Sequence, residues 1–443
     1  MIRTMKLASV LMLLWALTAR GADPTTATTK SFSVADFGAV ANGTTLCTVA
    51  FQKALDAAAT AGGGTVLVPD GQYLLGSVVM KANTTLKLSD KAVVIGSSSA
   101  GDYPIVQVRF EGEMVQGHRG LIYAEKADHI AIEGNGTIQG SMTLGDLRNP
   151  RAPVLLEFVN CDDVKLVNFS TTNRRIWSIH PMFCTNVLAS HLHIRSTLSQ
   201  SNGDGIDVDS SQHVRIENCD IDTGDDAISL KSGRNTEAVT IAKPTKDVTI
   251  TNCTLGSNFA GVGIGTEMSA GVLDVRIDHI TFTHGVNSIY IKSRTGRGGL
   301  IDNINVDTIT SRTSTFLGID LVNKGIVGKA PLTGMDGIPQ ASHISITNAK
   351  LQCVTFVDSR ANMVDARKPV DGLTLGGITG TCQRGLTISH VKNVNLYDIH
   401  VTVPGQLLTA TDVTGTGLSD PSQPATRPAA AETGRATSGP SGP

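Results

Sequence analysis

A strand-like phrase, QHVRIENC at residues 212–219, returns 34 residues later as KDVTITNC at residues 246–253. Both copies alternate apolar and polar side chains, which is the pattern of a half-buried β-strand. Related phrases precede and follow them, and most successive copies lie roughly 23 to 34 residues apart: DDVKL (162–166), TNV (185–187), LDVRI (273–277), DNI (302–304) and SHISI (342–346). A repeat of this length indicates a solenoid, in which each repeat stacks on the one before it.

The repeats contain no helical half, so a leucine-rich or helical solenoid fits them poorly. A β-propeller would need a period of about 40 residues or more, which is longer than most of these steps. The sequence therefore predicts an all-β fold, a parallel β-helix coiled from a single chain. An Ala-rich amphipathic stretch, residues 49–61, ends at Gly62–Gly64 and predicts a helix that caps the N-terminal end of the coil.

The two ends of the chain differ from this repetitive middle. Residues 1–22 carry Arg3 and Lys6 before a short apolar run, as a secretory signal peptide does. Residues 31–413 form the predicted β-helix domain, and residues 416–443 are a low-complexity tail expected to be disordered. We therefore expect a secreted or periplasmic protein that does not stay in a membrane once the signal is removed.

The net charge of −2 argues against a nucleic-acid partner, since such proteins show a basic face. A β-helix exposes unpaired strand edges only at its two ends, so a monomer is the default expectation.

A second set of strands follows the first in each repeat, at residues 205–210, 227–232, 262–267 and 289–293. Aligning their apolar positions places Asp204 and Asp226 on adjacent turns, about 4.8 Å apart along the stack, with Asp225 beside them. The same alignment gives two outward columns. One contains Asp207, Ser229, Gly263 and Tyr290, and the other contains Asp209, Lys231, Gly265 and Lys292. Asp209 is expected to pair with Lys231, which leaves Lys292 for a ligand.

Three crowded carboxylates cannot all ionise easily, so one proton is held more tightly than on an isolated acid. A set with one protonated and one ionised carboxyl can donate and accept protons in the same reaction. Glycoside hydrolysis needs this division, with an acid for the leaving oxygen and a base for water. The sequence therefore predicts a carbohydrate-cleaving enzyme whose catalytic residues are Asp204, Asp225 and Asp226.

The chain resembles glycoside hydrolase family 28, the polygalacturonase family, from Val34 to about Val403. The most specific matches are WSIHP at 177–181, NGDGID at 202–207 and TGDDAI at 223–228. The resemblance implies a right-handed β-helix with an open cleft, and hydrolysis of galacturonate bonds in pectin with inversion. It also implies no metal and no cofactor. Asp225 would be the general acid, and Asp204 and Asp226 would activate the attacking water.

Asn202, His180, Tyr290 and Lys292 are the residues expected to bind the substrate. Two positions depart from the family pattern. Ala260 stands where the family has a His, and Tyr290 stands where it has an Arg that grips a galacturonate carboxylate. Tyr cannot replace the charged fork of Arg, so a rhamnogalacturonan or a substituted pectin becomes a plausible substrate.

Two other functions stay open from the residues alone. A polysaccharide lyase could use the same aspartates to hold calcium through oxygen ligands. Alternatively, the fold could serve as a carbohydrate-binding protein that has lost catalysis, since fold does not dictate function.

Overall fold

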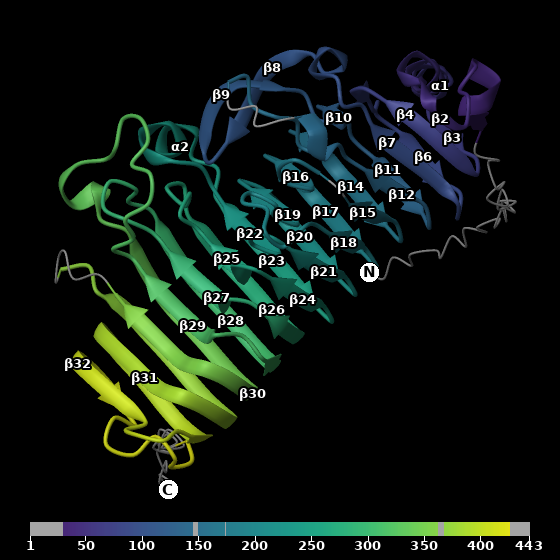
Figure 1. Cartoon of the computed structure of the whole chain (residues 1–443). Coiled ribbons are helices and arrows are strands. Elements are labelled where there is room, and N and C mark those ends of the chain that lie inside the picture. Colours follow the sequence, from purple (N-terminus) through teal and green to yellow (C-terminus); the bar gives the residue numbers. More distant parts are fainter. Residues whose placement is uncertain (1–29, 145–148, 173, 362–366, 426–443) are drawn as a thin grey trace, which may run out of the picture.

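The computed structural model describes residues 30–144, 149–172, 174–361 and 367–425. In this part of the chain, parallel strands stack turn upon turn into one long coil (Figure 1). The predicted parallel β-helix is confirmed. The predicted signal segment, residues 1–22, lies outside the described residues. The first residues of the predicted tail are described, and the carbonyls of Pro421 and Gln423 accept hydrogen bonds from the backbone of β31.

The strands form three stacks, each running the length of the coil. The first stack contains β1 (Ser31–Ser33), β3 (Gly64–Val68), β6 (Thr84–Leu88), β11 (Ile130–Gly134), β14 (Asp162–Val167), β17 (Thr185–Ser190), β20 (Gln212–Glu217) and β23 (Thr245–Thr251). The second contains β2 (Asn42–Leu46), β4 (Gly71–Leu75), β7 (Ala92–Gly96), β12 (Thr137–Gln139), β15 (Ser170–Thr172), β18 (His193–Arg195), β21 (Asp220–Thr223) and β24 (Thr254–Ser257).

The third stack carries the candidate site. It contains β5 (Val78–Val79), β10 (Ile122–Glu125), β13 (Leu156–Val159), β16 (Ile179–Met182), β19 (Ile206–Asp209), β22 (Ile228–Lys231), β25 (Ala260–Ile264), β27 (Asn287–Lys292) and β29 (Thr315–Asp320). Longer strands complete the C-terminal turns: β26 (Val272–His284), β28 (Leu300–Ser311), β30 (Gln340–Arg360), β31 (Val370–Thr402) and β32 (Leu408–Thr416).

The repeated phrase marks the corner at which the chain enters the first stack. His213, Asp247, Asp274 and Asn303 all have φ near +55°, in the left-handed region. Asn, Asp and His adopt this conformation more readily than other residues with a side chain. The apolar residue that follows each of them points inward, and Val214, Val248, Val275 and Ile304 are buried in consecutive turns. The phrase therefore encodes a corner followed by a core position.

The N-terminal end of the coil is covered by α1 (Thr48–Thr60), as the sequence predicted within one residue at each end. The helix buries Phe51, Ala54, Leu55 and Ala58 against the first turns. Gly62 follows with φ +88°, a conformation that lets the chain leave the helix and start β3. The second helix, α2 (Asn235–Ile241), lies beside the third stack.

One element departs from the coil. The strands β8 (Ile105–Phe110) and β9 (Glu113–His118) form an antiparallel hairpin whose two-residue turn is Glu111–Gly112. Both turn residues have positive φ, as tight hairpins require. The base of the hairpin pairs with Arg151, which precedes β13, and its turn bonds to Arg234, which follows β22. The hairpin therefore reaches from the segment that precedes β13 to the segment that follows β22.

Candidate active site

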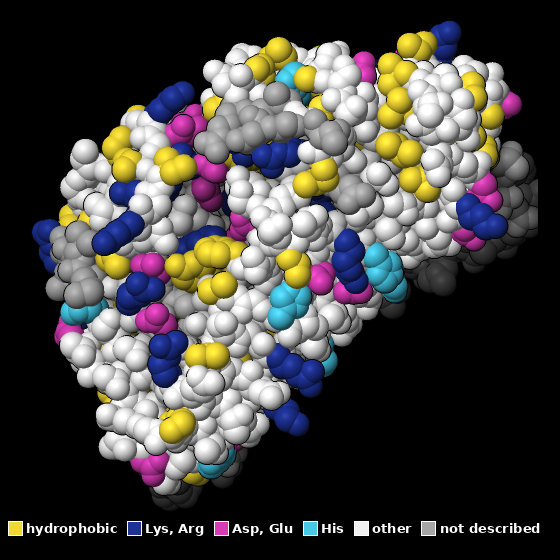
Figure 2. All heavy atoms as spheres, in the orientation of Figure 1, with side chains coloured by type: hydrophobic (Ala, Val, Ile, Leu, Met, Phe, Trp, Pro, Cys, Tyr) yellow, Lys and Arg dark blue, Asp and Glu magenta, His cyan; other side chains and the backbone are white. Residues whose placement is uncertain are grey.

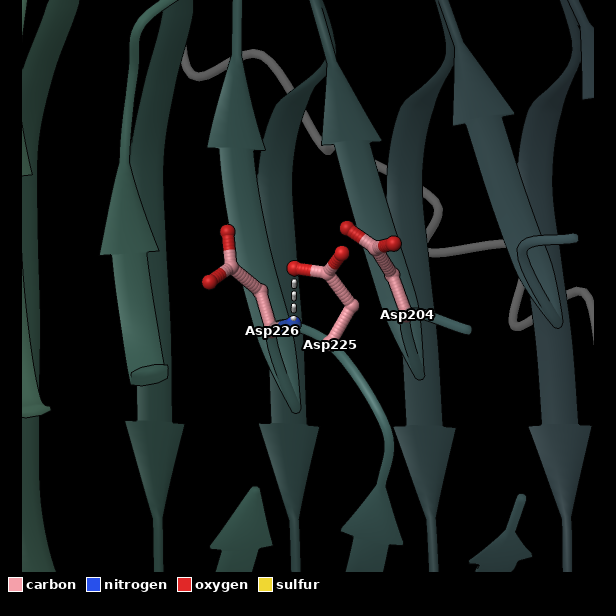
Figure 3. Close-up of side chains that lie close together, drawn as sticks. All are labelled: Asp204, Asp225 and Asp226. Atoms are coloured by element: carbon pink, nitrogen blue, oxygen red, sulfur yellow. Dashed lines mark hydrogen bonds between the residues drawn. The ribbon is translucent and has the colours of Figure 1, made fainter. Parts of the chain in front are cut away.

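The three predicted aspartates meet at the start of two adjacent strands of the third stack. Asp204 precedes β19, and Asp225 and Asp226 precede β22. Ile206 pairs with Ile228, and the backbone N–H of Gly205 donates to the carbonyl of Asp226 at 3.0 Å. One carboxylate oxygen from each aspartate lies within 4.8 Å of the other two. Figure 3 shows the three side chains rising from neighbouring strands in the same direction.

The backbone around the aspartates is fixed by buried side chains. The guanidinium of Arg174 donates to the carbonyls of Gly203 and Asp204 at 3.1 and 3.0 Å. The hydroxyls of Thr223 and Ser257 donate to the carbonyl of Asp225 at 2.7 and 2.8 Å. These bonds hold the two turns in place, which a site that must position reacting atoms requires.

The aspartates differ in exposure. Asp204 and Asp226 are 3% and 2% exposed, whereas Asp225 is only half-buried. The carboxylate of Asp225 accepts hydrogen bonds from the backbone N–H groups of Asn202 and Asp226, at 2.9 and 3.0 Å. Asp225 is therefore the carboxyl that a bound polymer can reach most readily.

Two lysines balance the buried carboxylates. The Lys292 ammonium lies 3.1 Å from Asp226 Oδ2, and the Lys231 ammonium lies 3.6 Å from Asp204 Oδ2 and 2.6 Å from Asp207 Oδ1. The predicted ion pair between Lys231 and Asp209 is wrong. Asp209 pairs with Arg109, and Lys231 pairs with Asp207 instead. Lys292 pairs with Asp226 and also lines the cavity that holds the aspartates, so its predicted contact with a substrate stays a prediction.

Burial and crowding set the protonation of this cluster. Burial raises the pKa of Asp204 well above its ordinary value, and the nearby Asp207 carboxylate raises it further. Burial also raises the pKa of Asp226, although Lys292 opposes the shift. Carboxyls that interact this closely titrate as a set. The two buried aspartates therefore hold protons more tightly than isolated aspartates do, while Lys231 and Lys292 favour the ionised forms that a base requires.

His180 lies below the cleft and not in its lining. Its side chain has no exposed surface, and its ring nitrogens lie 3.7 Å from Glu157 and 3.7 Å from Asp209. Burial lowers the pKa of His180, but Asp209 and Glu157 outweigh burial and raise it to about 9. The Trp177 ring packs against His180, and Phe110 of the hairpin stacks on Trp177, so both cover His180. His180 therefore belongs to a buried network of charged groups.

The hairpin is fastened beside this network at the edge where the strands of the third stack end. From β8, the fully buried Arg109 reaches Asp209 at 3.1 Å and the hydroxyl of Ser210 at 3.0 Å. At the turn, Arg234 lies 3.5 Å from Glu111 and 3.6 Å from Glu113. Sequence reasoning missed this element, although the alternating IVQVRF and EMVQGH around Glu111–Gly112 carry the signal of a hairpin.

The other predicted substrate-binding residues lie at the cleft. Asn202, with φ +54°, lines the cavity that holds the aspartates, and its side-chain oxygen accepts from Arg151 at 3.3 Å. Tyr290 stands on β27 in the predicted column with Ser229 and Gly263. Its hydroxyl donates to Asp320 at 3.3 Å.

A cavity of about 320 Å³ surrounds the aspartates, and a larger one of about 660 Å³ continues from it beneath the hairpin. Glu111, Asn202 and Ile326 line both, so the two form a continuous trough. Figure 2 shows basic and acidic side chains gathered on this face, near the hairpin. A third cavity of about 250 Å³ lies on the other side of the aspartates, around Tyr290.

The three aspartates also form a set of donors that a hard cation could use. Two of the three carboxylates, however, already face an ammonium group, Lys231 or Lys292. These fixed positive charges suit the cluster to proton transfer better than to cation binding, so the chemistry below uses the side chains alone.

A parallel β-helix with this carboxylate cluster defines a class of polysaccharide-cleaving enzymes, and comparison with known proteins identifies the family. The profile described as Glycosyl hydrolases family 28 matches residues 60–402. A probable polygalacturonase of Vitis vinifera is 31% identical over 375 residues, covering 81% of this chain and 74% of that protein. An exo-poly-alpha-D-galacturonosidase of Dickeya chrysanthemi is 25% identical over 327 residues, covering 62% and 54%.

Two solved structures share the fold. An exopolygalacturonase of Thermotoga maritima superposes with a TM-score of 0.70 at 22% identity, covering 83% of this chain and 91% of that one. A family 28 exopolygalacturonase of Yersinia enterocolitica gives 0.74 at 21% identity, covering 87% and 78%. The chain belongs to family 28 of the glycosyl hydrolases, and it is a glycosidase. The lyase and the non-catalytic binding protein that the residues left open are thereby set aside.

Proposed function

We propose that the protein hydrolyses galacturonate-containing pectic polysaccharide, with Asp225 as general acid and with inversion at the anomeric carbon. The observation that carries the proposal is the meeting of three carboxylates within 4.8 Å in a cleft of a family 28 coil. The names of the relatives, a probable polygalacturonase and an exo-poly-alpha-D-galacturonosidase, support a galacturonate substrate.

In this mechanism Asp225 gives its proton to the glycosidic oxygen as the bond to the anomeric carbon breaks. Asp204 and Asp226 hold a water molecule and take one of its protons, and the remaining hydroxide bonds to the anomeric carbon. The greater exposure of Asp225 supports its role, because the acid must reach an oxygen of the bound polymer. Lys231 and Lys292 limit the cost of holding ionised carboxylates in a buried place.

The stereochemical outcome has its own test. Carboxyl pairs are about 5–5.5 Å apart in retaining glycosidases and about 6.5–9.5 Å apart in inverting ones. The present oxygens lie within 4.8 Å, but here two carboxylates share the water, so a rule for pairs does not apply directly. Proton NMR of the first product formed distinguishes the two outcomes, and inversion predicts the anomer opposite to that of the substrate.

The hairpin supports attack at a chain end. It spans the third stack on one side of the aspartates, from Arg151 to Arg234. A buried ion pair between Arg109 and Asp209 fastens it, and Arg234 pairs with Glu111 and Glu113 at its turn. The hairpin stands over the trough beside β13 and β16 and so restricts the path of a long polymer across them. We therefore propose that one end of the chain enters the trough and that short units are removed from it.

Secretion and a monomeric state belong to the same proposal. Secretion is supported by the charged and apolar pattern of residues 1–22 and by the size of a polysaccharide substrate. In the described part of the chain, neither helix is long and apolar enough to cross a bilayer.

The test compares the natural protein with Asp225→Asn on a panel of pectic polymers. Loss of a general acid is expected to lower kcat by about 10²–10⁴-fold. Asp247→Asn is the matched control, because Asp247 is an exposed corner residue paired with His213. Attack at chain ends predicts short products by mass spectrometry while the viscosity of the polymer falls slowly. Equal activity of the natural protein and Asp225→Asn on every polymer would refute the mechanism.

A further inference from the structure

The two sides of the aspartate cluster carry different charge. The 660 Å³ cavity under the hairpin is lined by three basic side chains and one acidic side chain, Arg151, Arg175, Lys329 and Glu111. The 250 Å³ cavity on the other side is lined by two acidic side chains and one basic side chain, Asp320, Asp358 and Arg360. The lining of the hairpin side therefore carries more basic than acidic side chains, and the lining of the opposite side carries more acidic than basic ones.

The cations near the second cavity are already engaged. Arg360 lies 3.5 Å from Asp358, and the Lys292 ammonium lies 3.1 Å from Asp226. Lys292 also lies 4.5 Å above the ring of Phe259, so that ring covers part of its charge. A carboxylate brought here would meet Asp320 and Asp358 without a cation of its own, and like charges at short range are unfavourable.

Aromatic rings take the place of the missing charge. Phe259, just before β25, and Tyr290, on β27, lie with ring centroids 5.7 Å apart on adjacent turns, and their planes meet at 71°, edge to face. Gly318 makes room for the second ring, because a Cβ there would lie 2.8 Å from Tyr290 Cδ2. The Tyr290 hydroxyl is held by Asp320 and by Asn323, whose amide donates to it at 3.4 Å. The two rings, called here the Phe259–Tyr290 platform, thus have a fixed position beside the aspartates.

We propose that the scissile bond joins an acidic sugar, held on the hairpin side, to an uncharged sugar that rests on the Phe259–Tyr290 platform. The proposal rests on the hydrolytic function above and names the bond. An aromatic ring offers a large, rigid apolar surface to a sugar ring, and this contact does not require a charge on the sugar. The uncharged unit is either a neutral sugar, as in a polymer alternating galacturonate with rhamnose, or a methyl-esterified galacturonate.

The experiment measures kcat/KM on three sets of oligosaccharides of equal length: unesterified galacturonate, methyl-esterified galacturonate, and alternating galacturonate and rhamnose. One of the two sets with an uncharged unit is expected to be preferred by about ten-fold or more, the range that pocket contacts supply. The set that is preferred identifies the source of the uncharged unit. A preference for unesterified galacturonate would overturn the proposal.

Substitutions at Tyr290 test whether the Phe259–Tyr290 platform causes the preference for an uncharged sugar. Tyr290→Arg places a charged fork beside Lys292 and is expected to move the preference toward unesterified galacturonate by about ten-fold. Tyr290→Phe keeps the ring and is expected to keep the preference of the natural protein. If Tyr290→Arg leaves the order of substrates unchanged, the platform does not set specificity and the proposal is overturned.

Binding separates this inference from the hydrolytic function. Calorimetric titration of the same oligosaccharides into Asp225→Asn reads affinity without turnover. Tighter binding of the uncharged sets with no cleavage of any set by the natural protein would sink the hydrolytic function and leave the specificity standing. If the natural protein cleaves rapidly but binds and cuts unesterified galacturonate best, the hydrolytic function stands and the proposed specificity falls.

Discussion

Two ion pairs of equal length lie in different surroundings, one at an exposed corner of the coil and one in the cleft. At the exposed corner, His213 Nδ1 lies 2.6 Å from Asp247 Oδ2, and both side chains are more than half exposed, at 55% and 58%. At the cleft, Lys231 Nζ lies 2.6 Å from Asp207 Oδ1, with exposures of 7% and 0%. Water screens the first pair and is excluded from the second. Burial, and not distance, therefore decides how much each pair matters.

The largest effect is expected from Lys231→Met, which would leave Asp204 and Asp207 buried without their ammonium group. Breaking a buried pair from one side lowers the free energy of unfolding by about 3–5 kcal/mol. Activity should fall with it, because Asp204 then holds a proton more tightly. Lys246→Met is the matched control, since Lys246 and Asp274 are 49% and 43% exposed and such pairs contribute about 0–1 kcal/mol. Urea unfolding measures both variants. Equal losses in the free energy of unfolding would contradict the claim that burial decides the contribution of an ion pair.

The next effect concerns pH. The pKa of His180 is raised from 6.5 to about 9 in the folded protein. A raised pKa means that the imidazolium stabilises the fold fully below pH 6.5, and that this contribution is lost as pH rises through about 9. The shift corresponds to about 3 kcal/mol. The Tm of the natural protein should therefore fall between pH 6.5 and pH 9.

His180→Gln should show a lower Tm at pH 6 and a flatter profile above it. His213→Asn, at the exposed corner, should follow the natural protein throughout, because Asn tolerates the left-handed conformation of this residue. A fall in Tm of the same size in His180→Gln and in the natural protein would show that another group titrates in this window.

The smallest effect belongs to the corner and comes from the backbone. His213 has φ +55°, so His213→Asn, which removes the ion pair but tolerates this conformation, should leave stability almost unchanged. His213→Val places a β-branched residue there, and the left-handed conformation costs about 1–2 kcal/mol. Thermal unfolding of the two variants separates the effect of the ion pair from the effect of the backbone conformation. An equal loss of stability in both variants would contradict this account.

The fold was predictable because its information is local. Each corner residue, such as Asp247 or Asn303, is followed at once by the apolar residue that enters the core, so one phrase sets both the turn and the register. Strand register has a period of two, and a correct alignment at Ile206 and Ile228 therefore placed Asp204 beside Asp226 without further knowledge.

The neighbours of the aspartates were less predictable because they come from distant parts of the chain. Arg109 is 100 residues from Asp209, and its arrival redirects Lys231 to Asp207. The same hairpin, through the stacking of Phe110 on Trp177, covers His180 and removes it from the cleft surface. No repeat pattern encodes these contacts, since the hairpin is an insertion between turns.

That insertion has a consequence for engineering and for descent within the family. In a solenoid each turn contacts only its neighbours, so a segment added at one junction leaves the other turns undisturbed. The hairpin occupies residues 105–118. Its chief anchors are Arg109, which pairs with Asp209, and Glu111 and Glu113, which pair with Arg234. A coil that cuts polymers in the middle could thus become one that trims their ends by acquiring one short module and the charged residues that anchor it.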